Sequence, residues 1–252
     1  MMLKAEHIGV TVGGKRILTD ISFSVAEGEW LMLAGPNGAG KSTLIHAVSG
    51  GMKYEGTVTV GGKDLHAMKP AQIACEMGVL AQMNSVSYAY TVRQVVELGR
   101  YARSRGMLAR EQNERAVEEA LQSTGLAEMA DRNVLTLSGG ELQRTFLAQL
   151  LAQDPKILIL DEPANHLDLV YQERLFSLVQ EWLKKGGRCV ISVVHDLSLA
   201  KFYGTKALLM KEGKCIACGE CGDTLKDENL EKAYDMDVGT YMRKLLGRWK
   251  EN

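Results

Sequence analysis

The chain has 252 residues, of which 46% are apolar and 24% charged, a composition that predicts one globular unit with a sizeable core. A formal net charge of −1 offers no general attraction to nucleic acid or to an acidic membrane surface, so we expect no nucleic-acid partner. The opening MMLKAEHIGV lacks the apolar run of a signal peptide, and the longest apolar runs are strand-sized. We therefore expect a cytoplasmic chain, with any membrane span supplied by another protein.

Strand patterns occupy the first part of the chain. The alternating runs are IGVTV, ILTDISFSV and WLMLAG, with turn signals at Gly13–Gly14 and Glu27–Glu29 between them. A further pair, GTVTV and the segment from Lys63, flanks Gly61–Gly62. These patterns predict a largely antiparallel N-terminal β subdomain.

The third of these runs leads into GPNGAGKST, which fits the pattern G-x-x-x-x-G-K-[ST] in full. Glycines allow backbone N–H groups to curl around the phosphates of a nucleotide, and the helix that follows points its positive end at them. Lys41 adds a cation, and the Ser42 hydroxyl can ligate Mg²⁺. We predict that ATP phosphates are bound by Gly35, Pro36, Asn37, Gly38, Ala39, Gly40, Lys41, Ser42 and Thr43.

From Thr91 the apolar spacing becomes helical. The segments VRQVVELGRYA and EQNERAVEEALQSTG both show it, and Gly125 marks a C-terminal stop. One buried face is predicted for the second segment, made by Val117, Ala120, Leu121 and Thr124. We expect a helical subdomain inserted over about residues 83–137.

A second glycine-rich turn, LSGGELQR, follows directly. Ser138 is a good N-cap, Gly139 and Gly140 expose backbone N–H groups, and the helix predicted after them ends before Asp154–Pro155. These features predict a second anion site. Because the first loop already surrounds the phosphates of one ATP, we predict a two-fold homodimer in which each LSGG turn caps the γ-phosphate held by the other chain.

Two continuously apolar runs come next, in KILILDE and RCVISVVHD, with an amphipathic helix predicted between them over YQERLFSLVQEWLKKGG, from Tyr171. This order predicts a parallel sheet covered on both faces, where ligands bind beyond the carboxyl ends of the strands. The predicted fold is therefore α/β, a phosphate-loop NTPase core with a mainly parallel sheet, an N-terminal antiparallel β subdomain and an inserted helical subdomain.

Polar residues at the ends of these strands are candidates for catalysis. Asp161 would hold Mg²⁺, through water, and Glu162 would polarise the water that attacks the γ-phosphate. His195 could donate a hydrogen bond to the γ-phosphate or orient that water. Gln82, after the strand-like GVLA, could reach the metal or the water when the site is assembled.

Three cysteines in CIACGECGD have the spacing of part of an iron–sulfur motif. That interpretation needs a fourth thiolate, and no C-P follows at the expected distance. The alternative, which we favour, is that Cys215, Cys218 and Cys221 are small residues of a β-hairpin around Gly213 and Gly219.

In the order and spacing of its motifs, the chain resembles the ATP-binding cassette (ABC) ATPases from about residue 3 to 238. The motifs that carry this resemblance are GPNGAGKST, Gln82, LSGGELQR, ILILDEP, NHLD at 165–168 and His195-Asp196. LSGGE is the most specific of these elements. The resemblance implies that Ser138 and Gly140 act across a dimer interface and that Asp168 lies at that interface. It also implies that the segment after Gln82 contacts a membrane partner.

Softer matches, TVRQVVELGRY, LAEMADRNVLTLSGGELQR and VVHDLSLAKFY, are similar to the importer ATPases for iron–siderophore, haem and cobalamin. This similarity implies a peripheral Mg-ATPase on the cytoplasmic face of the membrane, with separate permease subunits and an extracytoplasmic substrate-binding protein. The alternatives are the ATPase of an exporter and a soluble ABC protein acting on ribosomes or nucleic acid. We expect one ABC domain over residues 1–252, with a packed amphipathic tail from about residue 239.

Three positions depart from the family pattern. Val12 stands where an aromatic residue usually stacks on adenine, which predicts that adenine is held mainly by apolar contact. Ala81 replaces the usual proline before the glutamine, and Ala164 replaces a common threonine after DEP.

Overall fold

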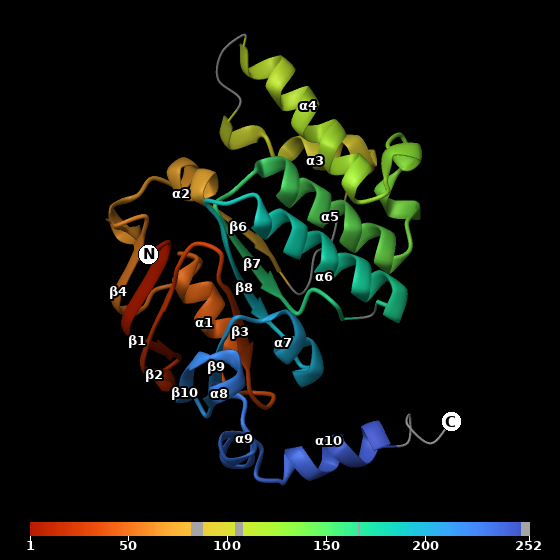
Figure 1. Cartoon of the computed structure of the whole chain (residues 1–252). Coiled ribbons are helices and arrows are strands. Elements are labelled where there is room, and N and C mark those ends of the chain that lie inside the picture. Colours follow the sequence, from red (N-terminus) through yellow and green to blue (C-terminus); the bar gives the residue numbers. More distant parts are fainter. Residues whose placement is uncertain (82–87, 104–107, 166, 248–252) are drawn as a thin grey trace.

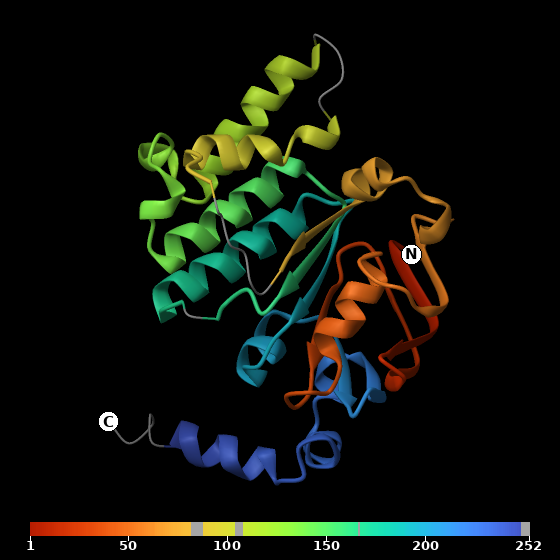
Figure 2. The same cartoon turned by 180° about the vertical axis from the view of Figure 1, so that it is seen from behind.

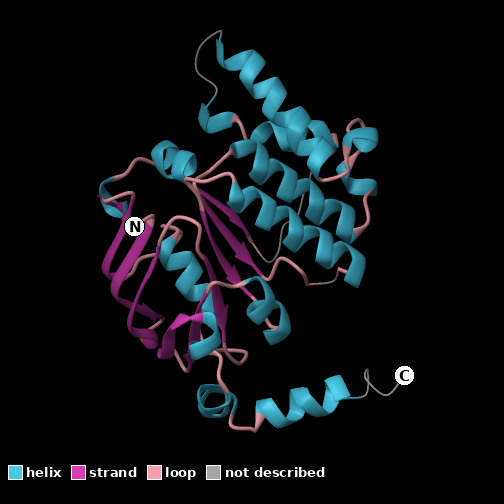
Figure 3. Cartoon of the chain, viewed as in Figure 1, coloured by secondary structure: helices cyan, strands magenta, loops and turns pink. Residues whose placement is uncertain are grey.

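The computed structural model describes residues 1–81, 88–103, 108–165 and 167–247 (Figure 1). The four-stranded sheet forms one outer side of the molecule, and the six-stranded sheet lies between it and the large group of helices (Figure 3). Among the described residues, none of the helices combines the length and the apolar character needed to cross a bilayer.

The first sheet is four-stranded and antiparallel, in the order β2-β1-β4-β5. Its strands are β1 (Leu3–Val12), β2 (Lys15–Val25), β4 (Glu55–Val60) and β5 (Lys63–Asp64). Alternate residues of β1, among them Leu3 and Ala5, are fully or almost fully buried, because successive side chains of a strand point to opposite faces. The prediction of an antiparallel N-terminal region is confirmed for these strands, but the run at Trp30–Ala34, which we grouped with them, lies in the other sheet and pairs there in parallel.

The second sheet has six strands in the order β10-β9-β3-β8-β7-β6. They are β3 (Trp30–Ala34), β6 (Met77–Leu80), β7 (Ile157–Asp161), β8 (Cys189–Val193), β9 (Lys206–Lys211) and β10 (Lys214–Glu220). All neighbouring pairs are parallel except β9 with β10. Every residue of β3, β7 and β8 is buried, as expected for parallel strands covered on both faces. The predicted fold class is confirmed.

Alternate residues of β3 enter two different cores. Leu31 and Leu33 pack with the antiparallel sheet and α1 (Lys41–Val48), whereas Trp30 and Met32 pack with α6 (Leu169–Lys184) and α7 (Leu197–Tyr203). The Trp30 ring stacks on Phe176 with centroids 5.6 Å apart. The central sheet is therefore held between two hydrophobic layers, which fixes the ends of its strands.

A third core lies in the helical segment. It is formed by α3 (Val92–Leu98), α4 (Leu108–Ser123), α5 (Gly139–Gln153) and the short helical turns Ala127–Met129 and Val134–Thr136. The predicted buried face of α4 is confirmed, and Gly125 ends that helix region at φ +66°. Since α5 contributes to this core and to the one beneath the sheet, it joins the helical segment to the central sheet.

Smaller elements complete the chain. Between β5 and β6 lie the turn Leu65–Ala67 and α2 (Pro70–Glu76), and the turn Tyr101–Arg103 follows α3. After β10 come α8 (Cys221–Thr224), α9 (Asp227–Tyr234) and α10 (Val238–Gly247), the last projecting along one side of the molecule (Figure 2). The described part of the predicted C-terminal tail is helical, but its packing is partial, because Met242 contacts the core whereas Tyr241, Leu245 and Leu246 are exposed.

The predicted β-hairpin is present as β9 and β10 and contains Cys215 and Cys218, but Cys221 lies outside it as the first residue of α8. Cys215 packs against the core shared with the antiparallel sheet, whereas Cys221 lies in the core on the other side and is buried. Burial raises the pKa of Cys215 to about 11, which disfavours the thiolate that a cluster would need. The described residues include no group of three or more His, Cys, Asp or Glu side chains able to hold a metal.

Candidate functional site

Three strands of the central sheet, β3, β7 and β8, bring polar side chains to one edge. β8 lies between the other two, and all three run in parallel, so their carboxyl ends meet. The glycine-rich loop leaves β3 after Ala34, Asp161 is the last residue of β7, and His195 follows β8 by two residues. The predicted convergence at this edge is confirmed.

The loop 35–43 has the backbone that its glycines require. Gly35, Gly38 and Gly40 have φ of +142°, +78° and +95°. A Cβ added at Gly35 would lie 2.1 Å from the carbonyl oxygen of Met210, so β9 leaves no space for a side chain there. Gly40 is the N-cap of α1, which directs the positive end of that helix at the loop. Pro36, Asn37, Ala39 and Thr43 lie in this loop and the first turn of the helix.

Lys41 is buried and bends back over its own loop. Its Nζ donates hydrogen bonds to the carbonyl oxygens of Gly35, at 2.7 Å, and Pro36, at 3.0 Å. Burial lowers the pKa of Lys41, while the negative charges of Glu162 and Asp161 oppose that shift. The loop therefore holds a desolvated cation, which a phosphate anion would stabilise further than the two carbonyl groups can.

Ser42 and Asp161 form the second polar contact of the edge. The Ser42 hydroxyl donates to Asp161 Oδ1 at 3.3 Å. Burial raises the pKa of Asp161, and the hydrogen bond from Ser42 only partly offsets this effect. A buried carboxylate without a full cationic partner, beside a hydroxyl oxygen, fits the hard oxygen donors that Mg²⁺ prefers.

Glu162 and His195 are brought together at this edge. Glu162 has a positive φ of +52°, which is rare for a residue with a side chain. Its Oε1 lies 2.5 Å from His195 Nε2, and its Oε2 accepts a hydrogen bond from Asn165 Nδ2. The Glu162 side chain is only 9% exposed, whereas that of His195 is 40% exposed. Backbone strain at such a position is typical of functional sites.

The sequence reasoning did not anticipate Asn165 as a partner of Glu162. The residue after His195 also has a structural task, because Asp196 accepts hydrogen bonds from the N–H groups of Ser198 and Leu199 and so caps α7. Gln82, proposed for the metal and the water, lies outside the described residues.

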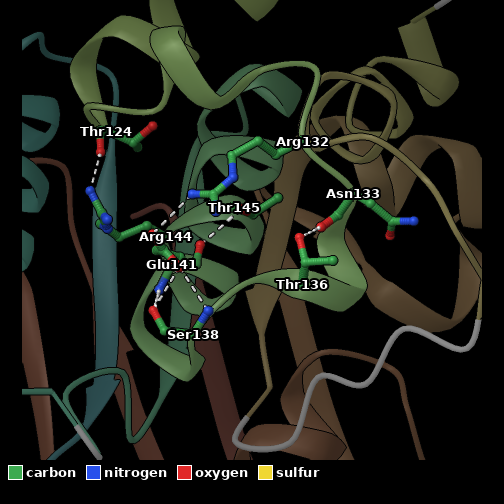
Figure 4. A network of polar contacts seen from close by, with 8 residues as sticks. All are labelled: Thr124, Arg132, Asn133, Thr136, Ser138, Glu141, Arg144 and Thr145. Carbon is green, nitrogen blue, oxygen red and sulfur yellow. Dashed lines mark hydrogen bonds and ion pairs between the residues drawn. The ribbon is translucent and has the colours of Figure 1, made fainter.

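The LSGG turn begins α5 with reciprocal capping. Glu141 N–H donates to Ser138 Oγ at 3.3 Å, while the N–H and hydroxyl of Ser138 donate to Glu141 Oε2 at 2.7 and 2.8 Å (Figure 4). Arg132 lies 3.7 Å from the other oxygen of Glu141. The predicted N-cap is confirmed, and the Glu141 partner completes a capping box that the sequence reasoning overlooked.

The start of α5 lies apart from the loop that precedes α1. Both views of the chain show the N-terminal end of α5 beside the start of α6, at the end of the helical layer, while the loop before α1 lies at the end of β3, on the other side of β7 and β8 (Figures 1 and 2). Ser138 and Gly139 are exposed, and Gly140 is partly exposed. One chain therefore presents two separate glycine-rich turns to its surface.

Asp168 begins α6 as its N-cap, with its carboxylate accepting a hydrogen bond from Tyr171 N–H at 2.9 Å. This local role was not predicted. An N-cap aspartate can be predicted from sequence when the start of the helix is placed correctly. This one was missed because the predicted helix began at Tyr171, three residues after Asp168.

Two further contacts to the phosphate loop come from distant segments. The Gly35 N–H donates to the hydroxyl oxygen of Tyr234 in α9, and Gly213 N–H, at the β9–β10 turn, donates to Ala39 O at 3.0 Å. Neither contact could be predicted from the local sequence, because both depend on how the sheet is assembled.

The positions that depart from the family pattern are also placed. Val12 ends β1 and is 52% exposed, so its apolar side chain is open to a ligand. Ala164 packs against the core on the α6 side of the sheet. Ala81 directly follows β6.

A complete phosphate loop at the end of a parallel strand, beside a buried aspartate and a glutamate–histidine pair, defines a phosphate-loop ATPase. A family profile described as ABC transporter matches residues 18–165. The chain belongs to the ABC transporter family, as one of its ATP-hydrolysing, ATP-binding proteins.

Three relatives show how the similarity is distributed. Over 239 residues the chain is 38% identical to the uncharacterized ABC transporter ATP-binding protein YvrA of Bacillus subtilis, covering 94% of this chain but 54% of that protein. It is 36% identical to the hemin import ATP-binding protein HmuV of Mesorhizobium japonicum, covering 93% of this chain and 91% of that protein. It is 37% identical to the cobalamin import ATP-binding protein BtuD of Halobacterium salinarum, covering 94% of this chain and 60% of that protein.

A solved structure has the same fold. An inward-facing metal-chelate type ABC transporter contains a chain with a TM-score of 0.80 and 25% sequence identity, covering 94% of this chain and 90% of that chain.

Proposed function

We propose that this chain is the ATPase subunit of an importer for a metal chelate of the iron–siderophore, haem or cobalamin type. It works at the cytoplasmic face of a membrane, with separate permease subunits and an extracytoplasmic substrate-binding protein. The hemin and cobalamin import relatives and the metal-chelate type transporter support this cargo class. They favour import over export and over a soluble role on ribosomes or nucleic acid.

The observation that carries the catalytic assignment is the contact between Glu162 and His195 at the edge that also holds the phosphate loop. Glu162 polarises the attacking water, since its carboxylate is positioned by both His195 and Asn165. His195, partly exposed, orients that water or donates a hydrogen bond to the γ-phosphate. The residues 35–43 bind the phosphates, with Lys41 turning from its loop carbonyls to the anion.

Ser42 and Asp161 are the residues of the described chain that would hold Mg²⁺, Asp161 through water, and Gln82 is the third residue proposed for the metal. The bound cation would neutralise charge on the β- and γ-phosphates. Asp161 is suited to this role because its burial leaves a carboxylate short of positive charge.

The two glycine-rich turns support a homodimer. Because the LSGG turn lies apart from the phosphate loop of its own chain, Ser138 and Gly140 reach an ATP held by a second copy. Asp168, at the start of α6, then lies at the same interface. ATP closes this dimer, hydrolysis releases it, and the permease converts the motion into alternating access.

The assignment is tested with Glu162→Gln, which keeps the size of the side chain and removes its basicity. We expect the variant to bind ATP, to dimerise in light scattering with saturating Mg-ATP, and to hydrolyse roughly 10²-fold or more slowly, the scale of a lost general base. Glu114→Gln, on the exposed face of α4, is the matched control and should behave as wild type. A Glu162→Gln chain that stays monomeric with ATP would contradict the dimer, and one that hydrolyses normally would contradict the catalytic assignment.

A further inference from the structure

The N-terminal part of α5 contacts Pro163 and Leu167, which lie between β7 and α6, and Tyr171 in the first turn of α6. A Cβ added at Gly140 would lie 3.4 Å from Leu167 Cδ2. Gln143 Nε2 donates a hydrogen bond to the carbonyl oxygen of Pro163. The Arg144 guanidinium carbon lies 4.7 Å from the centroid of the Tyr171 ring. Positions three and four apart on a helix share a face, so one face of α5 makes all three of these contacts.

Gln143 reaches the connection next to the catalytic glutamate. Pro163 directly follows Glu162, whose backbone has the uncommon φ of +52°. A side-chain amide bound to the Pro163 carbonyl restrains the peptide plane between Pro163 and Ala164, and so the residue that directly follows the backbone of Glu162. The bond is partly buried, so little water competes for the carbonyl.

The same helix begins with the LSGG turn. Ser138 and Glu141 cap each other, which makes the first turn of α5 one rigid piece. Thr145 Oγ1 adds a bond to Glu141 O at 2.9 Å within the next turn. A displacement of the LSGG turn is therefore passed to Gln143 without being absorbed by loose backbone.

We propose that Gln143 is a positioning residue that couples the two ATP sites of the dimer. This inference rests on the proposed homodimer, in which the LSGG turn of a chain faces the partner's ATP while its Glu162 faces its own. Engagement of the LSGG turn moves α5, and the Gln143–Pro163 bond carries that movement to Glu162. The stacking of Arg144 on Tyr171 moves the start of α6 together with α5. Hydrolysis at one site then depends on ATP at the other, which is a coupling free energy between two sites.

The test replaces the hydrogen-bond donor while keeping the length of the side chain. For Gln143→Met we expect the maximal ATPase rate to fall about tenfold, which corresponds to about 1.4 kcal/mol, and the Hill coefficient for ATP to fall toward ~1. ATP affinity of the nucleotide-free monomer should change less than about twofold, because Gln143 is outside the phosphate loop. Gln143→Lys, which keeps an N–H donor, should recover part of the rate and of the cooperativity.

The control is Gln149→Met on the same helix, where position 149 faces α3 and its backbone lies against Gly99. It should retain the rate and the Hill coefficient of wild type. A normal rate in Gln143→Met would overturn the proposal, and so would a slow variant that keeps the cooperativity of wild type. A wild-type Hill coefficient of about 1, in protein whose Glu162→Gln form dimerises, would also overturn the coupling. Absence of any ATP-dependent dimer would instead count against the proposed function.

Discussion

Two buried charges, those of Lys41 and Asp161, are the physical basis for the proposed nucleotide and cation sites. Each has polar contacts that satisfy it only in part, two carbonyl oxygens for Lys41 and one hydroxyl for Asp161. Burial lowers the pKa of Lys41 and raises the pKa of Asp161, and each shift favours the neutral form of the side chain. Phosphate oxygens and a divalent cation would supply the missing partners, so the chain without ligand carries electrostatic strain at this edge.

Asp161 gives a prediction about stability as well as activity. Its pKa is raised in the folded chain, so the folded form prefers the protonated carboxyl, and stability is lost as the pH rises through the usual range of aspartate and above. At neutral pH, Asp161→Asn without nucleotide should melt higher than wild type by roughly 2–4 °C, the shift that about 1 kcal/mol gives in a chain of this size.

The difference in melting temperature should shrink below about pH 4, where an ordinary aspartate is protonated in both states. Mg-dependent ATP hydrolysis should be lost in the same variant. Thermal melts at the two pH values, with an ATPase assay, check both parts. Equal melting temperatures at neutral pH would show that the buried carboxylate carries no cost in the ligand-free chain.

For single residues, the sequence predicted which side chains belong to the candidate site but not which side chains they contact. Phosphate-loop residues are fixed by a local pattern of glycines, and Asp161, Glu162 and His195 were predicted from the strands that precede them. The contact of Glu162 with Asn165 and the left-handed backbone of Glu162 depend on how the chain turns after β7. No spacing in the sequence reports such a turn.

Among the elements, α5 is the one that combines folding and function. Its capping box holds the LSGG turn, and its residues join the helical core to the core beneath the central sheet. Hydrogen bonds from Ser138 hold the pKa of Glu141 below its usual range. The capping interaction therefore contributes stability above the usual glutamate range and loses it as the pH falls through the lowered pKa.

Glu141 tests the importance of this cap. Glu141→Ala removes the acceptor for Ser138 and should lower the free energy of unfolding by about 0.5–2 kcal/mol, the range for lost helix caps. Glu141→Gln preserves the capping box and should cost far less. Urea unfolding at pH 7 measures both. If the two variants are equally stable, the reciprocal bonds at the start of α5 do not stabilise this chain.

The positions of helices and strands could be predicted from the spacing of apolar residues, because apolar side chains lie on the buried face of each element. The buried face of α4 and the all-apolar strands β7 and β8 are examples. The sequence limited the central strands to parallel arrangements. It did not determine their order, in which β8 lies between β3 and β7. The start of α6 was misplaced because Leu169 and Val170 are exposed and lie outside the amphipathic pattern.

The described part of the chain presents two separate glycine-rich turns, and this separation is the basis for the proposed dimer. A single chain that wraps its own ATP with residues 35–43 has no second use for LSGG, whereas two chains related by a two-fold axis use both turns twice. The transport assignment adds a membrane partner to this dimer. Capture of that partner distinguishes an importer from the soluble alternative, which ATP hydrolysis alone does not.

The most direct measurement isolates tagged Glu162→Gln from detergent-solubilised membranes of the source organism in the presence of Mg-ATP, then identifies its companions by mass spectrometry. Membranes lacking the tag provide the background. We predict a many-spanning permease in stoichiometric amount, accompanied by a substrate-binding protein whose bound metal chelate names the cargo. Ribosomal proteins, DNA-binding factors or no companion at all would contradict the importer and leave an ATPase of another system.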